Sequence, residues 1–173
     1  GHAVQVCKET LADFEGNILV LGGDGPLLRP STIEQMIDLQ RQCGSSGTLA
    51  TSIIPDPTGY GRILRDEQQR FAGIVEHKNA SPEQLEIHEV YPSYAIFHSD
   101  DLWPTVDALR PNELTNEYYF TEVPQMILEN GGSIEIVNSV APEDILSINT
   151  PEQLLHVERV LLARLQNEME PTA

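Results

Sequence analysis

The sequence predicts one α/β domain with a mixed, mostly parallel β-sheet flanked by helices, and three observations support this prediction. Residues 17–21 form a short apolar run bounded by glycines, which is typical of a buried parallel strand. A segment with helical spacing follows, and residues 48–54 form a second run rich in β-formers. This order of strand, helix and strand predicts a right-handed crossover that brings the two strands together as a parallel pair.

The helix after the first strand is predicted by its apolar spacing and by its two ends. Apolar residues recur at helical intervals over 33–37, Ser31 and Glu34 have the spacing of a capping box, and Gly44 can end the helix. The glycines between the first strand and this helix release the chain into a loop at the strand's carboxyl end. In open α/β sheets, ligands bind at that end.

The rest of the chain predicts further short elements. Strands are expected at 62–64, 73–75, 94–97 and 133–137, and helices at 101–109 and 122–128, the latter with Pro124 in its first turn. The polar segment 81–88 is expected to form a loop or a short helix.

The last helix is the most clearly marked. Thr150 can cap it, Pro151 would take the first helical position, and Gln153 completes a capping box. Its expected apolar stripe consists of Leu154, Val157, Leu161 and Leu165. Because no internal repeat or linker is visible, we expect one domain at 1–168 and a C-terminal tail at 169–173.

Composition limits the partners and the compartment. The formal net charge of −17 disfavours nucleic acid and anionic membranes as partners, because both require a basic surface. No apolar run is long enough to cross a bilayer and no signal peptide is visible, while Cys7 and Cys43 match no metal or redox spacing. We therefore expect a cytoplasmic protein with reduced thiols. The start without Met indicates a cropped chain, and the sequence does not indicate an oligomeric state.

Two oxygen-bearing residues far apart in the chain are candidate metal ligands. Asp24 follows Gly22 and Gly23 just past the run 17–21, an arrangement that can hold a divalent metal while the backbone approaches a nucleotide. Asn149 directly precedes a helix N-terminus, which attracts anions, and its side-chain oxygen could ligate a metal. Taken alone, each residue fits a turn or capping role at least as well.

Further clusters could contact a ligand, and each has a structural alternative. Gly61 lies in a glycine-rich turn that either admits a ligand close to the backbone or simply leads into a strand. Glu76 could accept hydrogen bonds from two sugar hydroxyls, or form a surface charge pair with Lys78 on the same face of a strand. Tyr118 and Tyr119 could flank a sugar ring, or divide between core and rim. No G-x-S-x-G, H-E-x-x-H or complete P-loop motif is present.

Taken together and in order, these motifs resemble the pyrophosphorylase domain of the bifunctional N-acetylglucosamine-1-phosphate uridylyltransferases. The resemblance runs from Gly1 to about Leu165, nearly the whole chain. Five segments at roughly the family's spacing carry it, namely 21–27, 56–63, 74–78, 117–119 and 148–150. The first three residues also resemble the end of the family's uracil-contacting loop.

The resemblance implies a Rossmann-like nucleotide-diphospho-sugar transferase fold and a Mg²⁺-dependent reaction. The phosphate of N-acetylglucosamine 1-phosphate would attack the α-phosphorus of UTP, giving a UDP-sugar and pyrophosphate, with alignment and charge neutralisation as the main requirements. Asp24 and Asn149 would hold the metal ion. The residues that the resemblance implies at the sugar or the nucleotide are Gly1, Gly22, Gly23, Gly61, Glu76, Tyr119 and Thr121.

Three departures from the family pattern affect this expectation. The glycine-rich opening loop with its arginine and lysine is absent, and ten Lys and Arg against 27 Asp and Glu leave little to neutralise a triphosphate. We therefore expect the chain alone to be an incomplete catalyst. Tyr91 stands where the family has a sugar-contacting asparagine, and we expect it to line the sugar pocket. Gly22 replaces a family tyrosine beside the nucleotide.

Two other functions remain open. The protein could be a uridylyltransferase for glucose or another hexose 1-phosphate, or a non-catalytic module that binds a nucleotide sugar. No hexapeptide repeat is present, so acetyl transfer and trimer formation are not expected of this chain. An open sheet that lacks the family's leading strands is expected to expose an edge and apolar surface.

Overall fold

The computed structural model describes residues 1–11, 13–113 and 115–169. Its central sheet has the strand order β1 (Asn17–Leu21), β7 (Tyr94–His98), β2 (Gly47–Ala50) and β8 (Ile134–Val137). β7 runs antiparallel to both β1 and β2, whereas β8 pairs with β2 in parallel. Three of these four strands therefore share one direction, and the predicted mixed α/β fold is confirmed.

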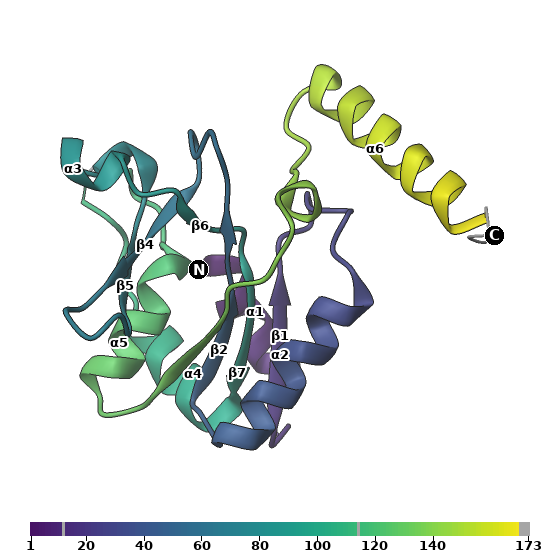
Figure 1. Cartoon of the computed structure of the whole chain (residues 1–173). Coiled ribbons are helices and arrows are strands. Elements are labelled where there is room, and N and C mark those ends of the chain that lie inside the picture. The colour runs from purple at the N-terminus through teal and green to yellow at the C-terminus, as the bar shows by residue number, and fades with distance from the viewer. Residues whose placement is uncertain (12, 114, 170–173) are drawn as a thin grey trace.

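A second sheet, entirely antiparallel, lies beside the first (Figure 1). Its order is β3 (Ser52–Ile53), β6 (Glu89–Tyr91), β4 (Gly61–Arg65) and β5 (Phe71–Val75). The predicted strand at 48–54 is in fact divided between the two sheets, with Thr51 at the junction of β2 and β3. The sequence pattern did not reveal this division because both halves are rich in β-formers.

Helices cover both faces of the central sheet, as Figure 1 shows. α2 (Pro30–Cys43) packs on one face, while α4 (Ser99–Ala108) and α5 (Val123–Glu129) pack on the other. α1 (His2–Thr10) lies against α4, and α6 (Pro151–Met169) extends away at the upper right of the view. The short helical segments are η1 (His77–Asn79), α3 (Pro82–Leu85), η2 (Phe120–Glu122) and η3 (Pro142–Ile145).

Alternation along the central strands creates two hydrophobic cores. On β7, Ala95 and Phe97 face the core shared with α4 and α5, whereas Tyr94 and Ile96 face the core that contains Met36 of α2. This period of two is what a strand buried on both faces requires. The fold thereby places the carboxyl ends of β1, β2 and β8 at one end of the molecule.

Several sequence expectations about packing are wrong. β1 and β2 run in the same direction but do not pair, because β7 lies between them. The strand β1 was expected to be buried but lies at the edge of the sheet, with Leu19 39% and Leu21 41% exposed. The separate expectation that the sheet exposes an edge with apolar surface agrees with this position. Hydrophobicity marks a strand but does not tell an edge position from a central one.

The predicted start of α2 is wrong, whereas its predicted end and the predicted start of α6 are confirmed. α2 is capped by the backbone of Arg29 and not by a Ser31–Glu34 box, because the helix already begins at Pro30. Gly44 does end it in the left-handed conformation (φ 58°). The capping box of α6 is confirmed: the Gln153 backbone N–H donates to Thr150 Oγ1 (3.2 Å), and the Thr150 N–H donates to Gln153 Oε1 (3.0 Å).

The predicted apolar stripe of α6 is buried only at Val157, whereas its three leucines are all exposed. No helix in the described part of the chain is long and apolar enough to span a membrane. Both Cys7 and Cys43 are free and exposed. The expected tail lies, from residue 170 onward, outside the described residues.

A bidentate ion pair between β4 and β6 of the second sheet makes stability depend on pH. Arg65 Nε and Nη2 donate to the two oxygens of Glu89, both at 2.7 Å, and Thr51 Oγ1 donates to Glu89 Oε1 at 2.7 Å. Burial alone would raise the pKa of Glu89, but the hydrogen bonds from Arg65 and Thr51 outweigh it, so the pKa is lowered. The pair therefore stabilises the fold above the unfolded-state pKa of roughly 4.3, and this contribution is lost as pH falls through the folded-state pKa.

We expect Glu89→Gln to lower the free energy of unfolding by about 2 kcal/mol at pH 7, because it leaves the Arg65 guanidinium without its carboxylate. Urea unfolding at pH 7 and at pH 3 measures this, and the difference from the wild type should shrink at the lower pH. Glu67→Gln, in the exposed turn between β4 and β5, is the control. An equal loss at both pH values would contradict the assigned role of the charge.

Candidate functional site

A pocket opens where the loops that follow β1, β5 and β8 meet the N-terminal half of α6. Its volume is about 360 Å³, within the range of small-molecule sites. Of the predicted site residues, it collects Asp24, Gly61, Glu76, Tyr91, Thr121 and Asn149. The structure thus brings together six candidates that lie up to 125 positions apart in the sequence, 24 to 149.

Asp24 and Asn149, the predicted metal ligands, line the same pocket and lie on segments that a backbone hydrogen bond joins. The Ile148 N–H donates to the Asp24 carbonyl at 2.9 Å, which joins the loop after β1 to the segment before α6. The Asn149 N–H donates to Gln153 Oε1 at 2.7 Å, and its side-chain Nδ2 donates to Ser147 Oγ at 3.4 Å. With its amide nitrogen directed to Ser147, Asn149 can offer its side-chain oxygen to a ligand.

Two of the glycines next to Asp24 leave little room for a side chain, whereas Gly23 lies in open space. A Cβ on Gly22 would lie 2.8 Å from Asp24 Oδ1, and a Cβ on Gly25 would lie 2.5 Å from the hydroxyl of Tyr94. Gly22 also donates its N–H to the Ser93 carbonyl at 3.2 Å. Gly22 and Gly23 do not line the pocket themselves, so the structure gives Gly22 a supporting position beside the carboxylate.

The Glu76 carboxylate, which lines the pocket, is held by a threonine hydroxyl. Thr121 Oγ1, in η2, donates to Glu76 Oε1 at 2.7 Å. The expected strand alternation that places Glu76 and Lys78 on one face is wrong, because β5 ends at Val75 and the chain turns into η1. Lys78 points elsewhere, to Glu117 (3.2 Å) and over the ring of Tyr119 (4.9 Å to the centroid).

Tyr91 contributes a buried phenol to the pocket wall. The residue is 4% exposed, and its hydroxyl has no hydrogen-bond partner among the described residues. Burial, and then the nearby Glu76 carboxylate, raise the pKa of this phenol. A buried hydroxyl without a partner costs about 1–3 kcal/mol, so a ligand hydroxyl or carbonyl that reached it would recover that energy.

Behind the pocket, β4 is fixed by a buried arginine. Gly61 has no room for a side chain, since a Cβ would lie 2.9 Å from Ile74 Cγ2. Arg62 is 1% exposed; its Nη1 donates to the Tyr60 carbonyl, and its Nη2 lies 3.2 Å from His77 Nδ1. His77, which follows Glu76, therefore has a structural partner.

Besides Gly22 and Gly23, two further predicted site residues do not line this pocket. Gly1 and Tyr119 line a separate, more open hollow together with Tyr118. The Tyr119 hydroxyl is 3.0 Å from Thr115 Oγ1, within the same surface loop. Tyr118 packs partly against the core, so the adjacent tyrosines divide between core and rim in this structure.

Other pocket residues were missed from the sequence. Tyr60 donates its hydroxyl to the Ile145 carbonyl at 2.9 Å, and Tyr94 donates to the Asp144 carbonyl at 3.2 Å. Gln153 and His156 reach the pocket from α6. Their position three residues apart on one helix face was a usable signal, but only once the start of α6 was known to lie at the site.

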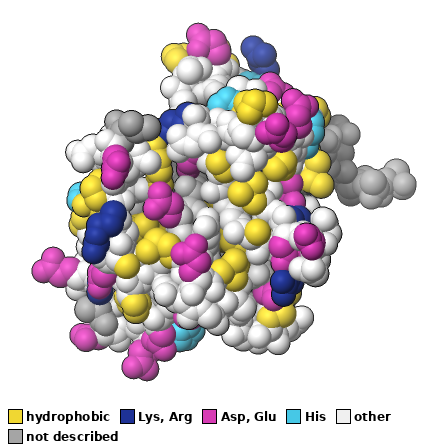
Figure 2. Space-filling view, turned by 90° about the vertical axis from the view of Figure 1, so that its left-hand side faces the viewer, with side chains coloured by type: hydrophobic (Ala, Val, Ile, Leu, Met, Phe, Trp, Pro, Cys, Tyr) yellow, Lys and Arg dark blue, Asp and Glu magenta, His cyan; other side chains and the backbone are white. Residues whose placement is uncertain are grey.

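The hydroxyls of Tyr60 and Tyr94 remain protonated hydrogen-bond donors at neutral pH. Burial raises the pKa of Tyr60, the hydrogen bond with Ser147 lowers it, and the charge of Asp24 raises it further. Burial, followed by the charges around it, raises the pKa of Tyr94 to about 12. Acidic side chains are spread over the face seen in Figure 2 and basic ones are fewer, and none of the described residues that line the pocket is Lys or Arg.

The oxygen donors present suit a magnesium ion. Among the described residues, no group of three or more His, Cys, Asp or Glu side chains could hold a metal. Mg²⁺, however, is commonly held by one or two protein oxygens together with substrate phosphates and water. The exposed carboxylate of Asp24 and the amide oxygen of Asn149, which both line the pocket, are oxygen donors of the kind that such a site uses.

Comparison with known proteins gives close relatives of one kind. The chain is 35% identical over 164 residues to the bifunctional protein GlmU of Solibacter usitatus, which covers 95% of this chain and 35% of that protein. GlmU of Heliobacterium modesticaldum is 35% identical over 168 residues, with 97% and 37% covered. The chain thus spans about a third of the length of these relatives, and no family model matches it.

Solved structures agree on the fold. A UDP-glucose pyrophosphorylase complexed with UDP-glucose has a TM-score of 0.67 at 12% identity, covering 94% of this chain and 61% of that one. A nucleoside-diphosphate-sugar pyrophosphorylase from Vibrio cholerae has a TM-score of 0.66 at 16% identity, covering 91% and 64%. The chain is therefore homologous, along nearly its whole length, to one region of the bifunctional GlmU proteins, and it has the Rossmann-like fold of the sugar-nucleotide pyrophosphorylases.

Proposed function

We propose that this chain forms the sugar-binding and metal-binding part of a cytoplasmic Mg²⁺-dependent uridylyltransferase. In the proposed reaction, UTP and a sugar 1-phosphate give a UDP-sugar and pyrophosphate. The substrate that we propose first is N-acetylglucosamine 1-phosphate. The observation that carries the proposal is the convergence of Asp24 and Asn149 in one pocket that also contains Glu76. Pairing a cation site with a hydroxyl-binding carboxylate suits a phosphorylated sugar.

Each residue has a defined part in this proposal. Asp24 and Asn149 would hold the ion, which supplies charge neutralisation and alignment of the phosphates when it is bound. Glu76, oriented by Thr121, would accept hydrogen bonds from sugar hydroxyls. The sugar phosphate is already an anionic nucleophile, so no strong general base is required. Because the lining has no Lys or Arg, the cationic contacts to a triphosphate would come from residues outside it.

Two other functions are kept as alternatives. The buried phenol of Tyr91 favours a different hexose 1-phosphate as substrate, since a bulky residue replaces an amide at the pocket wall. The acidic charge favours a non-catalytic module that binds a nucleotide sugar, since little in the chain neutralises a triphosphate.

The test is an assay of the full-length natural protein with UTP, Mg²⁺ and a panel of sugar 1-phosphates. Formation of pyrophosphate and UDP-sugar in equal amounts is expected, with the highest kcat/KM for N-acetylglucosamine 1-phosphate. If kcat/KM were instead highest for glucose 1-phosphate, the result would support a uridylyltransferase for that sugar phosphate. Calorimetric binding of UDP-N-acetylglucosamine without any pyrophosphate formation would instead support the binding module.

Tyr91 is expected to affect which sugar is accepted. Tyr91→Asn removes the ring from the wall and adds an amide, so kcat/KM for N-acetylglucosamine 1-phosphate relative to glucose 1-phosphate should change about tenfold, equivalent to roughly 1.4 kcal/mol. Tyr91→Phe, which deletes only the hydroxyl, separates hydrogen bonding from shape. A ratio unchanged in both variants would show that Tyr91 does not touch the sugar.

A further inference from the structure

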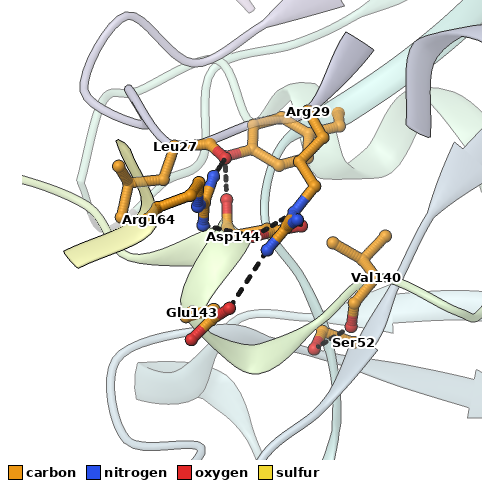
Figure 3. Close-up of polar contacts among 8 residues, drawn as sticks. Leu27, Arg29, Ser52, Val140, Glu143, Asp144 and Arg164 are labelled. Atoms are coloured by element: carbon orange, nitrogen blue, oxygen red, sulfur yellow. Dashed lines mark hydrogen bonds and ion pairs between the residues drawn. The ribbon is translucent and has the colours of Figure 1, made fainter. Parts of the chain in front are cut away.

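The buried carboxylate of Asp144 lies at the junction of three segments next to the pocket without lining it. Asp144 belongs to η3, and its side chain is 3% exposed. Arg29 Nε donates to both carboxylate oxygens, at 3.0 and 2.8 Å, and Arg164 Nη2 donates to Oδ1 at 2.6 Å. Figure 3 shows the two guanidinium groups approaching the carboxylate from opposite sides.

The two arginines come from different elements and make further contacts. Arg29 directly precedes α2 and also donates to Glu143 Oε1 at 3.1 Å. Arg164 lies on α6 and donates through Nη1 to the Leu27 carbonyl at 2.9 Å (Figure 3). The carboxylate therefore ties α6 and η3 to the loop that carries Asp24.

This ion cluster is one end of a double attachment between the two halves of the metal site. The segments 24–29 and 144–149 lie side by side: at one end Asp144 binds Arg29, and at the other the Ile148 N–H donates to the Asp24 carbonyl at 2.9 Å. Between these ends, Tyr94 and Tyr60 hold the carbonyls of residues 144 and 145. The position of Asn149 relative to Asp24 thus depends on both attachments.

The electrostatics make the Asp144 attachment sensitive to loss of charge. A buried carboxylate shared by two guanidinium groups is stabilised by charge-assisted, partly bidentate hydrogen bonds. Removing its charge leaves two cations facing one another with no anion between them, and the segments that carry them would separate. Among the described residues, the exposed Glu143 pairs with Arg29 and not with Arg164, so it cannot replace Asp144 between the two arginines.

We propose that Asp144 is a positioning residue that sets the separation of Asp24 and Asn149, and that Arg164 makes α6 part of the metal site. The inference rests on the proposed function, because it takes these two residues as the metal ligands. It predicts that neutralising Asp144 weakens cation binding far more than it weakens contact with the sugar, since Glu76 and Thr121 are attached to other elements.

The test uses Mn²⁺ as an EPR-visible probe, titrated into the full-length protein with UDP-N-acetylglucosamine present. Asp144→Asn is expected to raise the Kd for Mn²⁺ at least tenfold, while the KM for the sugar phosphate changes less than threefold. Arg164→Met, which leaves the Arg29 pair in place, should raise the Kd by a smaller factor. Asp144→Glu should recover part of the affinity, and Glu143→Gln is the matched control, expected to stay within twofold.

Thermal unfolding separates positioning from loss of the fold. If Asp144→Asn does not fold, Arg164→Met decides the outcome. If the folded Asp144→Asn and Arg164→Met variants bind Mn²⁺ with unchanged affinity while Asp24→Ala loses binding, the positioning role of Asp144 is overturned. The proposal that Asp24 is a metal ligand would then still hold. Unchanged affinity in Asp24→Ala overturns the metal site itself, and with it both proposals.

Discussion

Asp24→Ala is expected to abolish uridylyl transfer by the full-length protein while leaving its fold unchanged. The substitution removes one of the two protein oxygens proposed to hold a cation, and a catalytic cation contributes several kilocalories per mole, which corresponds to about 10³-fold in rate. The fold should persist because Asp24 is exposed and belongs to neither hydrophobic core. Pyrophosphate release at saturating substrates and Mg²⁺ measures the effect, and circular dichroism checks the fold.

Two comparisons make this result specific. Asp38→Ala removes the same side chain from the exposed face of α2 and should leave the rate unchanged. Raising the Mg²⁺ concentration should restore part of the activity of Asn149→Ala but little of that of Asp24→Ala, because a neutral ligand contributes less to cation affinity than a charged one. Full pyrophosphate release by Asp24→Ala would remove this residue from the mechanism.

The sequence predicted most of the elements, because each carried a local signal. The capping box of Thr150 and Gln153 and the left-handed Gly44 have the predicted structures, and the run 17–21 does form a strand, although at the sheet edge. These features depend on residues within a few positions of one another, so no tertiary information was required. The short strand β6 (Glu89–Tyr91) was missed because three residues are too few to show alternation.

The arrangement of the sheets could not be read in the same way. The insertion of β7 between β1 and β2 and the division at Thr51 depend on contacts between residues 36 (Ile53 and Glu89) to 81 (Asn17 and His98) positions apart. Likewise, the apolar residues of α6 predicted a buried stripe, yet only Val157 is buried. A local pattern states which face of an element is apolar, but not what lies against it.

The candidate site shows the same division between local and distant information. The motifs around Asp24, Glu76 and Asn149 indicated chemistry, and the structure collects all three in one pocket. Asp144 gave no signal, because an aspartate in a polar loop is ordinary until two arginines from positions 29 and 164 are seen to converge on it. Tyr119, which the tyrosine pair had also suggested, and Gly1, which only the resemblance implied, lie at another hollow.

Glu76→Gln is expected to raise the KM for the sugar 1-phosphate by 10- to 100-fold with a much smaller change in kcat. Hydrogen bonds to a charged acceptor contribute about 1.5–3 kcal/mol, and an amide offers one acceptor oxygen where the carboxylate offers two. Thr121 Oγ1 already occupies one oxygen at 2.7 Å, so the other is the one available to a sugar hydroxyl. Steady-state kinetics with the sugar phosphate varied at saturating UTP measure the effect.

Thr121→Val tests whether the orientation of Glu76 matters as well as its charge. It removes the hydroxyl that holds Oε1 but keeps the carboxylate, so the KM should rise by a few-fold, less than in Glu76→Gln. Combining the two substitutions should raise the KM little beyond Glu76→Gln alone, because the threonine acts through the carboxylate. If the two effects instead multiplied, Thr121 would contact the sugar independently. A KM unchanged in Glu76→Gln would place the sugar elsewhere in the pocket, because no substrate hydroxyl could then depend on that carboxylate.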